Sequence, residues 1–459
     1  MPIADHILSE LRAVLGDRLS TGESDRTLHG ASETFHSAPP PDAVAWPLTT
    51  EEVSSVLRIC NAHGVPVIGW GTGTSLEGHA LAIRGGLVLD MMRMDRVLDI
   101  RPADLLAVVQ PGVTREALNK ELRATGLMFP VDPGANASLG GMASTRASGT
   151  TAVRYGTMRQ NVLGLEAVLA DGTIIRTGSR AAKSSAGYDL TALLVGSEGT
   201  LGIITELTLR LHGQPEDVAA AVCAFPTLED AVTCVAQTMQ MGVPMARIEF
   251  MDALGMRAVN LHLGSNYPEQ PHLMVEFNGA PEAVKRDAEL FGAIAEEHHG
   301  AGFAWATSLE ERNRLWAARH ASYYAALKLR PGATGISTDI CVPMSELPAA
   351  VAAASADMHA SGLIGDVVGH VGDGNFHVLM LLEPGNQAEI AIAKGVAERM
   401  AHRALAVGGT ISGEHGIGVG KRGLMEAQHG PAWAVMGTIK RALDPNNIMN
   451  PGKMVPDMN

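Results

Sequence analysis

Residues 65–76 read VPVIGWGTGTSL, and this stretch restricts the possible folds more than any other part of the sequence. The apolar start predicts a short buried strand. The glycines and hydroxyl residues after it form a loop whose backbone N–H groups and hydroxyls can hold a phosphate group. The stretch is not a Rossmann fingerprint, because the G-x-G-x-x-G spacing is absent and no helix pattern follows at once. A flexible turn is the alternative, although a turn rarely needs so many hydroxyls.

Regular elements are predicted on both sides of this loop. Thr49 and Glu52 form a capping box before an apolar helical pattern that ends at Gly64. Apolar residues at 87–91 and at 105–109 predict two further strands. The loop therefore lies within a domain that mixes helices and strands.

Two more segments of the N-terminal half are rich in glycine and hydroxyl residues. Residues 132–156 read DPGANASLGGMASTRASGTTAVRYG, and residues 196–204 read GSEGTLGII. Segments with so few bulky side chains cannot build a core by themselves. We expect them to press against a large, flat ligand that carries phosphates. Three such loops within a domain of about 200 residues fit one dinucleotide.

A metal site is predicted around residues 367–380, which read VVGHVGDGNFHVLM. Asp373 and Gly374 favour a type I′ turn. That turn would put His370 directly opposite His377, with Cβ atoms about 5 Å apart. Two imidazoles held so close suit one divalent metal better than two like charges. A polar hairpin with incidental histidines is the alternative.

A second cluster can complete this metal site. Residues 410–418 read TISGEHGIG and place Glu414 and His415 between glycines. Two imidazoles and one carboxylate form a common catalytic zinc set with an open coordination position. Manganese or iron would accept similar ligands. His415 is then a candidate general base; alternatively it supports a ligand or is solvated.

Composition excludes several classes of partner. The chain has 459 residues, which favours two or more domains. Its 35 basic and 49 acidic residues give a net charge of −14, which argues against nucleic acid and anionic lipid as partners. Cys60, Cys223, Cys234 and Cys341 show no Cys-x-x-Cys spacing, which is typical of reduced, buried thiols in the cytoplasm.

The N-terminal residues predict an amphipathic helix and no signal or transit peptide. Residues 1–11 read MPIADHILSEL, with acids early and no basic region before an apolar run. No window approaches about 20 consecutive apolar residues, so we expect no transmembrane segment. The expected location is cytoplasmic, with peripheral attachment to the inner membrane left open.

The three glycine-rich loops resemble the FAD-binding domain of the vanillyl-alcohol oxidase (VAO) or PCMH-type flavoprotein family. The His-x-Gly-Asp-Gly-Asn-x-His motif, the GEHGIG motif and residues 444–453, DPNNIMNPGK, resemble its FAD-linked D-2-hydroxyacid dehydrogenase branch. That branch includes D-lactate dehydrogenases of the cytochrome-linked type, glycolate oxidase D-subunits and D-2-hydroxyglutarate dehydrogenases. The match covers nearly the whole chain after about residue 35.

The resemblance implies an α+β fold in three parts. Residues 1–215 would form a two-subdomain PCMH-type FAD-binding domain that begins with a helix at 1–20. Residues 216–410 would form an α+β cap, or substrate domain, built on an antiparallel sheet. Residues 411–459 would return to the FAD domain and complete the active site.

The same resemblance assigns residues to the cofactor. The pyrophosphate loop would be Gly71, Thr72, Gly73, Thr74 and Ser75. The flavin would be lined by Pro133, Gly134, Ser138, Gly141, Ser144, Gly149, Thr150 and Tyr155, with Gly199, Ile204 and Asn450 nearby. Arg146 departs from the Asn of many relatives, and it either reaches a phosphate or sits outside. His79 lies close to the phosphate loop, and we interpret the flavin as bound non-covalently.

The implied reaction is FAD- and metal-dependent oxidation of a small D-2-hydroxy acid to the 2-oxo acid. Arg319 would hold the acid's carboxylate, since guanidinium pairs bidentately with carboxylate; spacing alone favours an ordinary surface arginine. His370, His377 and Glu414 would hold the metal, His415 would take the hydroxyl proton, and flavin N5 would take the hydride. Electrons would pass to an external cytochrome, quinone or electron-transfer flavoprotein.

D-lactate or a similar short acid is the favoured substrate. Residues 336–343 read ISTDICVP and lack the lysine that precedes this segment in the 2-hydroxyglutarate branch. D-2-hydroxyglutarate and glycolate remain alternatives, as do a flavin lyase like the alkylglycerone-phosphate synthases and a flavin-free zinc hydrolase. The oligomeric state is open, with a homodimer among the options.

Overall fold

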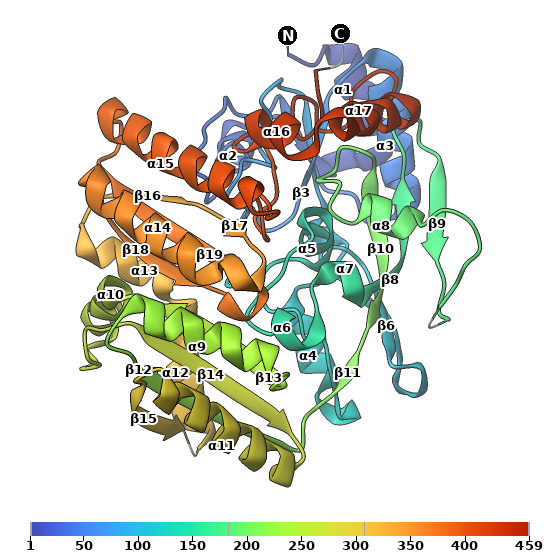
Figure 1. Cartoon of the computed structure of the whole chain (residues 1–459). Coiled ribbons are helices and arrows are strands. Elements are labelled where there is room, and N and C mark those ends of the chain that lie inside the picture. The colour runs from blue at the N-terminus through green and yellow to red at the C-terminus, as the bar shows by residue number, and fades with distance from the viewer. Residues whose placement is uncertain (1, 182, 307, 458–459) are drawn as a thin grey trace. The chain divides into compact units, whose positions relative to one another are not determined.

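The computed structural model describes residues 2–181, 183–306 and 308–457 (Figure 1). The chain divides into two compact units. Unit 1 comprises Met1–Ser148, Tyr155–Gln214 and Glu414–Asn459, and unit 2 comprises Gly149–Arg154 and Pro215–Gly413. Among the described residues, no helix is long and apolar enough to cross a lipid bilayer.

Unit 1 contains two main sheets. The first has the order β1-β2-β4-β3, formed by Leu19–Ser20, Ala43–Ala45, Leu87–Asp90 and Val67–Trp70. The second has the order β5-β6-β10-β8-β9, formed by Val97–Arg101, Leu106–Val109, Ile203–Arg210, Val162–Val168 and Ile174–Gly178. A small pair joins β7 (Leu127–Met128) to β11 (His212–Gly213). In the first sheet β2 and β3 run parallel to β4, whereas the second sheet is antiparallel.

Apolar helix faces build the core of unit 1. Helix α1 (Asp5–Leu15) buries Leu11 against the first sheet, and α3 (Thr50–His63) buries Leu57 there. The second sheet is covered by α4 (Arg115–Leu122) and α5 (Leu139–Thr145). The other helices of this unit are α2 (Glu23–Leu28), α7 (Met158–Asn161), α8 (Leu190–Leu194), α16 (Met425–His429) and α17 (Pro431–Leu443), whereas α6 (Ala152–Tyr155) lies mostly in unit 2.

The predicted helix α3 is confirmed, but its capping box is only half formed. The Thr49 hydroxyl accepts the Glu52 backbone N–H at 3.2 Å. The Glu52 carboxylate instead accepts the Leu48 N–H and pairs with Arg18. Arg18 carries a full charge and binds both oxygens of the Glu52 carboxylate, which favours this pairing over a bond to the Thr49 N–H.

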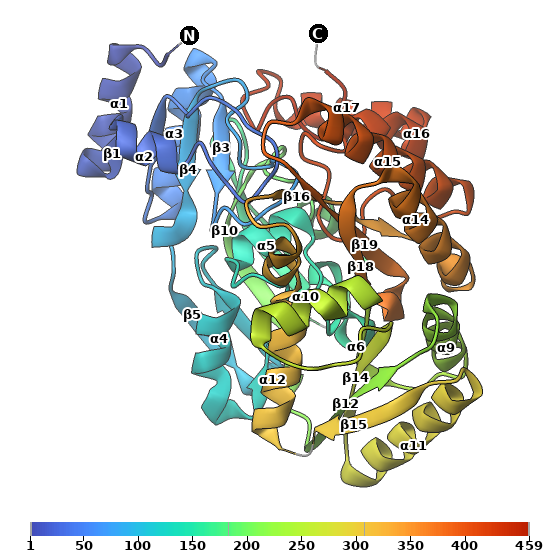
Figure 2. The same ribbon diagram turned by 90° about the vertical axis from the view of Figure 1, so that its left-hand side faces the viewer.

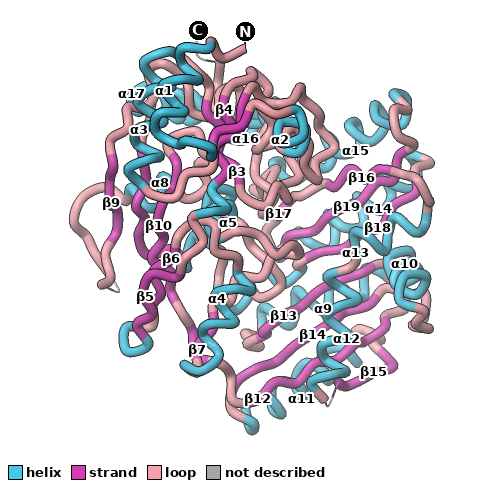
Figure 3. Tube along the Cα trace, turned by 180° about the vertical axis from the view of Figure 1, so that it is seen from behind, coloured by secondary structure: helices cyan, strands magenta, loops and turns pink. Residues whose placement is uncertain are grey.

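Unit 2 is built on one eight-stranded antiparallel sheet (Figure 3). Its order is β15-β12-β14-β13-β18-β19-β16, with β17 paired to β19. The strands are β12 (Asp217–Ala224), β13 (Met245–Met251), β14 (His272–Gly279), β15 (Ala301–Ala306), β16 (Thr334–Ser337), β17 (Ile340–Cys341), β18 (Ile364–Gly369) and β19 (Asn375–Leu382). This confirms the expected α+β cap on an antiparallel sheet.

Helices cover both faces of this sheet (Figure 2). One face carries α9 (Leu228–Gln240), α11 (Pro281–Glu297), α14 (Leu347–Ser361) and α15 (Gln387–Ala406). The other carries α10 (Ala253–Leu263), α12 (Leu309–His320) and α13 (Ser322–Ala326).

The predicted type I′ turn with His370 opposite His377 is wrong. In the observed register Val368 pairs with His377, and residues 371–373 form a 3-10 turn between β18 and β19. A type I′ turn needs two central residues with positive φ. Gly374 has a φ of 74°, but Asp373 does not adopt positive φ, and its N–H donates to the His370 carbonyl. His370 therefore lies just after the end of β18 and is not paired with His377 in the sheet.

Candidate active site

The glycine-rich loops of unit 1 gather at one place. Gly71 approaches α5 so closely that a Cβ atom there would overlap the Ser138 hydroxyl. The 196–199 loop joins them through two backbone hydrogen bonds. The Gly196 N–H donates to the Ala143 carbonyl at 2.8 Å, and the Glu198 N–H donates to the Ser144 carbonyl at 2.9 Å. The loops thus bring together small residues whose backbone N–H groups and hydroxyls suit the phosphates and flat ring of a dinucleotide.

The C-terminal segment meets the same loops. Asn450 has a φ of 41°, and its amide donates to the Glu198 carbonyl at 2.7 Å and to the His79 carbonyl at 3.0 Å. Lys453 is buried and donates to the carbonyls of His79 and Leu81. Asn450 is thereby fixed next to the loop that contains Gly199.

Glu198 ties the GEHGIG motif to this surface, and the sequence alone did not indicate it. Its carboxylate accepts the N–H groups of Ile417 at 2.6 Å and Gly418 at 2.8 Å, and it lies 3.3 Å from His79 Nε2. Burial alone would raise the pKa of Glu198, but His79 and the two N–H groups hold that pKa below its ordinary value. Glu198 is therefore a buried carboxylate anion.

The other residues assigned to the cofactor are divided between the two units, and some of them pack in the protein core. Ile204 is buried in the core of unit 1, and the Tyr155 ring packs edge-on to His212 at 5.0 Å. Gly149 and Thr150 belong to unit 2. Arg146 donates to the Val195 carbonyl at 2.9 Å and so anchors the loop before Gly196. The remaining assigned residues lie in unit 1: Thr72, Gly73, Thr74, Ser75, Pro133, Gly134 and Gly141.

His370 and His377 are close together in unit 2, as predicted. Their ring centroids are 5.6 Å apart and their planes are nearly perpendicular at 86°. His370 Nδ1 lies 2.8 Å from Glu249 Oε1, and His377 Nδ1 lies 3.0 Å from the Thr338 carbonyl. A carbonyl and an ionised carboxylate only accept, so both Nδ1 atoms donate; in a neutral imidazole this leaves on Nε2 the lone pair that a metal ligand needs. The donor chemistry of the pair fits a divalent ion.

Arg319 is buried, which argues against the surface-arginine alternative. Its side chain is 9% exposed, and Nε donates to Glu249 Oε2 at 2.7 Å. Nη1 donates to the Ser322 hydroxyl at 3.2 Å. Within the described ranges Nη2 makes no hydrogen bond, so it can receive an acid's carboxylate.

The chain before Glu414 is anchored beside His377. The Asp339 carboxylate lies 3.7 Å from His377 Nδ1 and accepts from the Asn375 amide at 2.9 Å and the Ser412 hydroxyl at 2.8 Å. Gly413 lies against Asn375, where a Cβ atom would overlap its amide. Glu414 follows Gly413 by one peptide bond, about 3.8 Å between Cα atoms, and His415 comes next.

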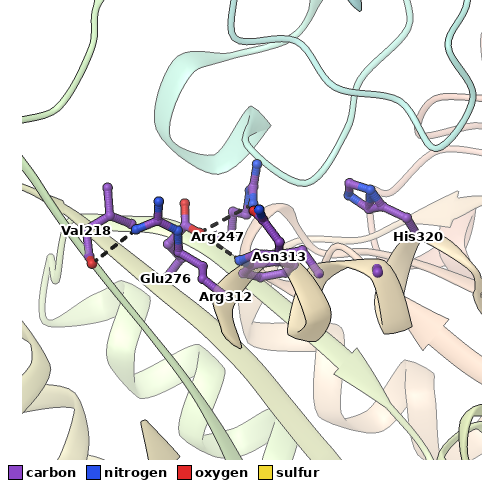
Figure 4. Close-up of a pocket in the computed structure, with 8 residues that line it drawn as sticks. Val218, Arg247, Glu276, Arg312, Asn313 and His320 are labelled. Atoms are coloured by element: carbon purple, nitrogen blue, oxygen red, sulfur yellow. Dashed lines mark hydrogen bonds and ion pairs between the residues drawn. The ribbon is translucent and has the colours of Figure 1, made fainter. Parts of the chain in front are cut away.

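A pocket of about 490 Å³ opens beside α12 in unit 2 (Figure 4). The Arg247 guanidinium lies 4.6 Å from the centre of the Trp316 ring. The Glu276 carboxylate accepts from Trp316 Nε1 at 2.7 Å and from Arg247 at 3.4 Å. Arg312 and His320 add basic groups to the lining.

Comparison with known proteins agrees with this organisation. Residues 41–178 match the family described as FAD binding domain, and residues 214–454 match FAD linked oxidases, C-terminal domain. The chain is 49% identical to "Probable D-lactate dehydrogenase, mitochondrial" of Danio rerio, over 98% of this chain and 92% of that protein. It is 38% identical to "D-lactate dehydrogenase [cytochrome] 1, mitochondrial" of Saccharomyces cerevisiae, over 98% and 80%. It is 36% identical to the glycolate oxidase subunit GlcD of Bacillus subtilis, over 90% and 89%.

Solved structures agree on the fold. A p-cresol methylhydroxylase superposes with a TM-score of 0.81 at 18% identity, over 99% of this chain and 97% of that one. An alkyldihydroxyacetonephosphate synthase superposes with a TM-score of 0.78 at 21% identity, over 99% and 87%. At these identities the likeness bears on the fold alone, and it confirms the expected PCMH-type architecture.

Proposed function

The chain belongs to the FAD-linked oxidases, in the branch of the D-lactate dehydrogenases, and on this premise we propose that it oxidises D-lactate to pyruvate. The relatives' names support the reaction class. The observation in unit 2 that carries the proposal is the pair His370 and His377 beside the buried Arg319–Glu249 ion pair. A 2-hydroxy acid has a hydroxyl that a metal ion can bind and a carboxylate that a guanidinium can bind, and unit 2 holds candidate residues for both. The FAD-binding match argues against the flavin-free hydrolase.

The proposed metal ligands are His370, His377 and Glu414. Zinc is the favoured ion, with manganese and iron as alternatives. When bound, FAD accepts a hydride at N5 and the metal ion lowers the pKa of the substrate hydroxyl. The flavin would lie on the surface formed by Gly71, Ser138, Ser144, Gly199 and Asn450.

The chain's own side chains would divide the remaining work. Arg319 would hold the acid through Nη2, because Nε and Nη1 are already engaged. This fixes the orientation of the 2-hydroxy group. His415 would take the hydroxyl proton as general base. Its Nε2 lies 4.0 Å from Glu414 Oε1, so the base and the proposed ligand adjoin.

D-lactate is favoured over longer diacids because residues 336–343 lack the lysine that precedes this segment in the 2-hydroxyglutarate branch. The external acceptor, whether a cytochrome, a quinone or an electron-transfer flavoprotein, is a prediction that the yeast relative's name supports for a cytochrome. The cytoplasmic location and a homodimer also stay predictions.

A panel of D- and L-2-hydroxy acids with an artificial dye acceptor tests the proposal. We expect dye reduction with D-lactate, little with L-lactate, and loss of activity with a chelator that added metal restores. Activity confined to D-2-hydroxyglutarate or glycolate would replace D-lactate as the substrate. Flavin that no 2-hydroxy acid reduces would contradict the oxidation itself.

A further inference from the structure

We infer that Glu249 is a positioning residue that couples the proposed metal ligand His370 to the proposed carboxylate clamp Arg319. The inference deepens the proposed function and rests on it. One carboxylate makes both bonds: Oε1 contacts His370 Nδ1 at 2.8 Å, and Oε2 contacts Arg319 Nε at 2.7 Å. Each oxygen thus serves one functional side chain.

Glu249 is held rigidly enough for this task. It is 1% exposed and lies within β13, between β14 and β18. The next residue, Phe250, pairs with Gly369, which directly precedes His370. Arg319 approaches from α12, which covers one face of the sheet. The carboxylate therefore links two neighbouring strands and a helix through bonds that water does not screen.

The two bonds have separate chemical consequences. Accepting from Nδ1 fixes the His370 tautomer that leaves the lone pair on Nε2, and it fixes the ring's orientation. By accepting from Arg319 Nε, the carboxylate holds the planar guanidinium in place and leaves Nη2 for a substrate. The arginine side chain then has little conformational entropy left to lose when the substrate binds. The negative charge also offsets the buried cation of Arg319, which would otherwise be unpaired.

The neighbouring pair supplies a matched control. Glu276 on β14 is also buried, at 7% exposed, and also accepts from an arginine, Arg247, and from Trp316 on α12. Arg247 and Glu249 alternate with Ile248 on β13, so both ion pairs lie on one face of the sheet. Glu276→Gln removes an equivalent buried charge without touching a proposed metal ligand.

The experiment compares Glu249→Gln, Glu249→Asp and Glu276→Gln with wild type. Affinity for Zn²⁺ is measured by competition with a chromophoric chelator, and KM for D-lactate is measured at saturating metal. We expect Glu249→Gln to weaken Zn²⁺ binding by about 10- to 100-fold, the usual effect of losing a ligand's supporting carboxylate. KM should rise in the same variant, Glu249→Asp should recover part of both, and Glu276→Gln should change neither.

A metal-free readout separates this inference from the proposed function. In protein labelled with ¹⁵N-histidine, and assigned with His370→Ala, the metal-free wild type should show the Nδ1–H tautomer at His370. Glu249→Gln should shift it toward a mixture. An unchanged tautomer and unchanged Zn²⁺ affinity, or equal losses in Glu276→Gln, would overturn the inference. Wild type that binds no metal yet shows the expected tautomer shift would overturn the proposed metal role and leave the positioning role standing. If Glu249→Gln does not fold, Glu249→Asp carries the same comparison.

Discussion

At the scale of single residues, buried charges in unit 2 are the features that sequence reasoning finds least well. The spacing around His370 and His377 predicts that they meet, and the family resemblance, not the spacing, indicates Arg319 as a clamp. Glu249 lies about 70 positions from Arg319 and more than that from His370, and nothing in its strand pattern marks it. A carboxylate's role at a buried site depends on its partners, and these are visible only after the sheet has formed.

Arg319→Ala should weaken binding of the acid. KM for D-lactate should rise by about 10-fold or more, because the variant lacks the guanidinium that would pair with the acid's carboxylate. Flavin content should stay at the wild-type level, because Arg319 lies in unit 2 and is not among the residues proposed to hold the flavin. Steady-state kinetics with flavin absorbance check this. An unchanged KM and rate would rule out the clamp.

Asp366→Asn should stabilise the protein at neutral pH. Asp366 is 1% exposed, and neither carboxylate oxygen has a hydrogen-bond partner among the described residues. Burial raises the pKa of Asp366 well above its ordinary value, and the neighbouring Asp252 raises it further. The native state therefore binds this proton more tightly than the unfolded chain. Stability from this group is full below the unfolded pKa of about 4 and is lost as the pH rises.

The gain in free energy of unfolding from Asp366→Asn should consequently grow as the pH rises above about 4. Its full size is about 1.4 kcal/mol for each unit by which the native pKa of Asp366 exceeds the unfolded one. Urea unfolding at several pH values measures it. A difference from wild type that stays constant between acid and neutral pH would show that Asp366 is not the protonated group.

At the scale of elements, the connection between β18 and β19 shows what a local motif predicts and what it does not. The Asp-Gly pair indicates a tight turn in the right place. It does not fix the turn type, because the same dipeptide suits a 3-10 turn that closes on Gly374. The register then follows from pairing with β13, since Gly369 is opposite Phe250. The sequence thus predicts the proximity of the two histidines but not the path between them.

Gly374→Ala should destabilise the protein by about 1–3 kcal/mol. Position 374 has a φ of 74°, and a Cβ atom there would overlap the Val342 carbonyl. Gly385→Ala is the control, since Gly385 has a φ of 80° but no atom within 4 Å of its Cβ position, so that only backbone strain remains. Urea unfolding compares the two. Equal losses would mean that the contact with Val342 contributes nothing.

At the scale of the whole molecule, the three glycine-rich loops and the closing motif suffice to predict the PCMH-type fold and an α+β cap. They do not predict how the C-terminal segment is fastened to unit 1. Lys440 donates to the Thr200 and Met449 carbonyls, and Lys453 donates to those of His79 and Leu81. Lysines are rarely buried, so a sequence pattern gives no reason to expect two in one core.

Lys453→Met should destabilise unit 1 by about 1–3 kcal/mol and lower its flavin content, because buried carbonyls lose their donor. Burial lowers the pKa of Lys453 to about 7, although Glu198 opposes the shift. Native Lys453 therefore releases its proton near pH 7, whereas in the unfolded chain it keeps the proton up to about pH 10.4. Wild-type stability should rise with pH between these values, and the gap to Lys453→Met should widen. Thermal unfolding from pH 7 to 9 checks the trend; a narrowing gap would contradict it.

The central proposal is that His370, His377 and Glu414 would hold a divalent ion that activates a D-2-hydroxy acid for oxidation by FAD. Anaerobic mixing of D-lactate with enzyme loaded with FAD and metal, followed at the flavin absorbance near 450 nm, tests it most directly. We predict rapid bleaching in wild type, and none in His377→Ala or after chelation, although both retain FAD. Bleaching of His377→Ala at the wild-type rate would contradict the account.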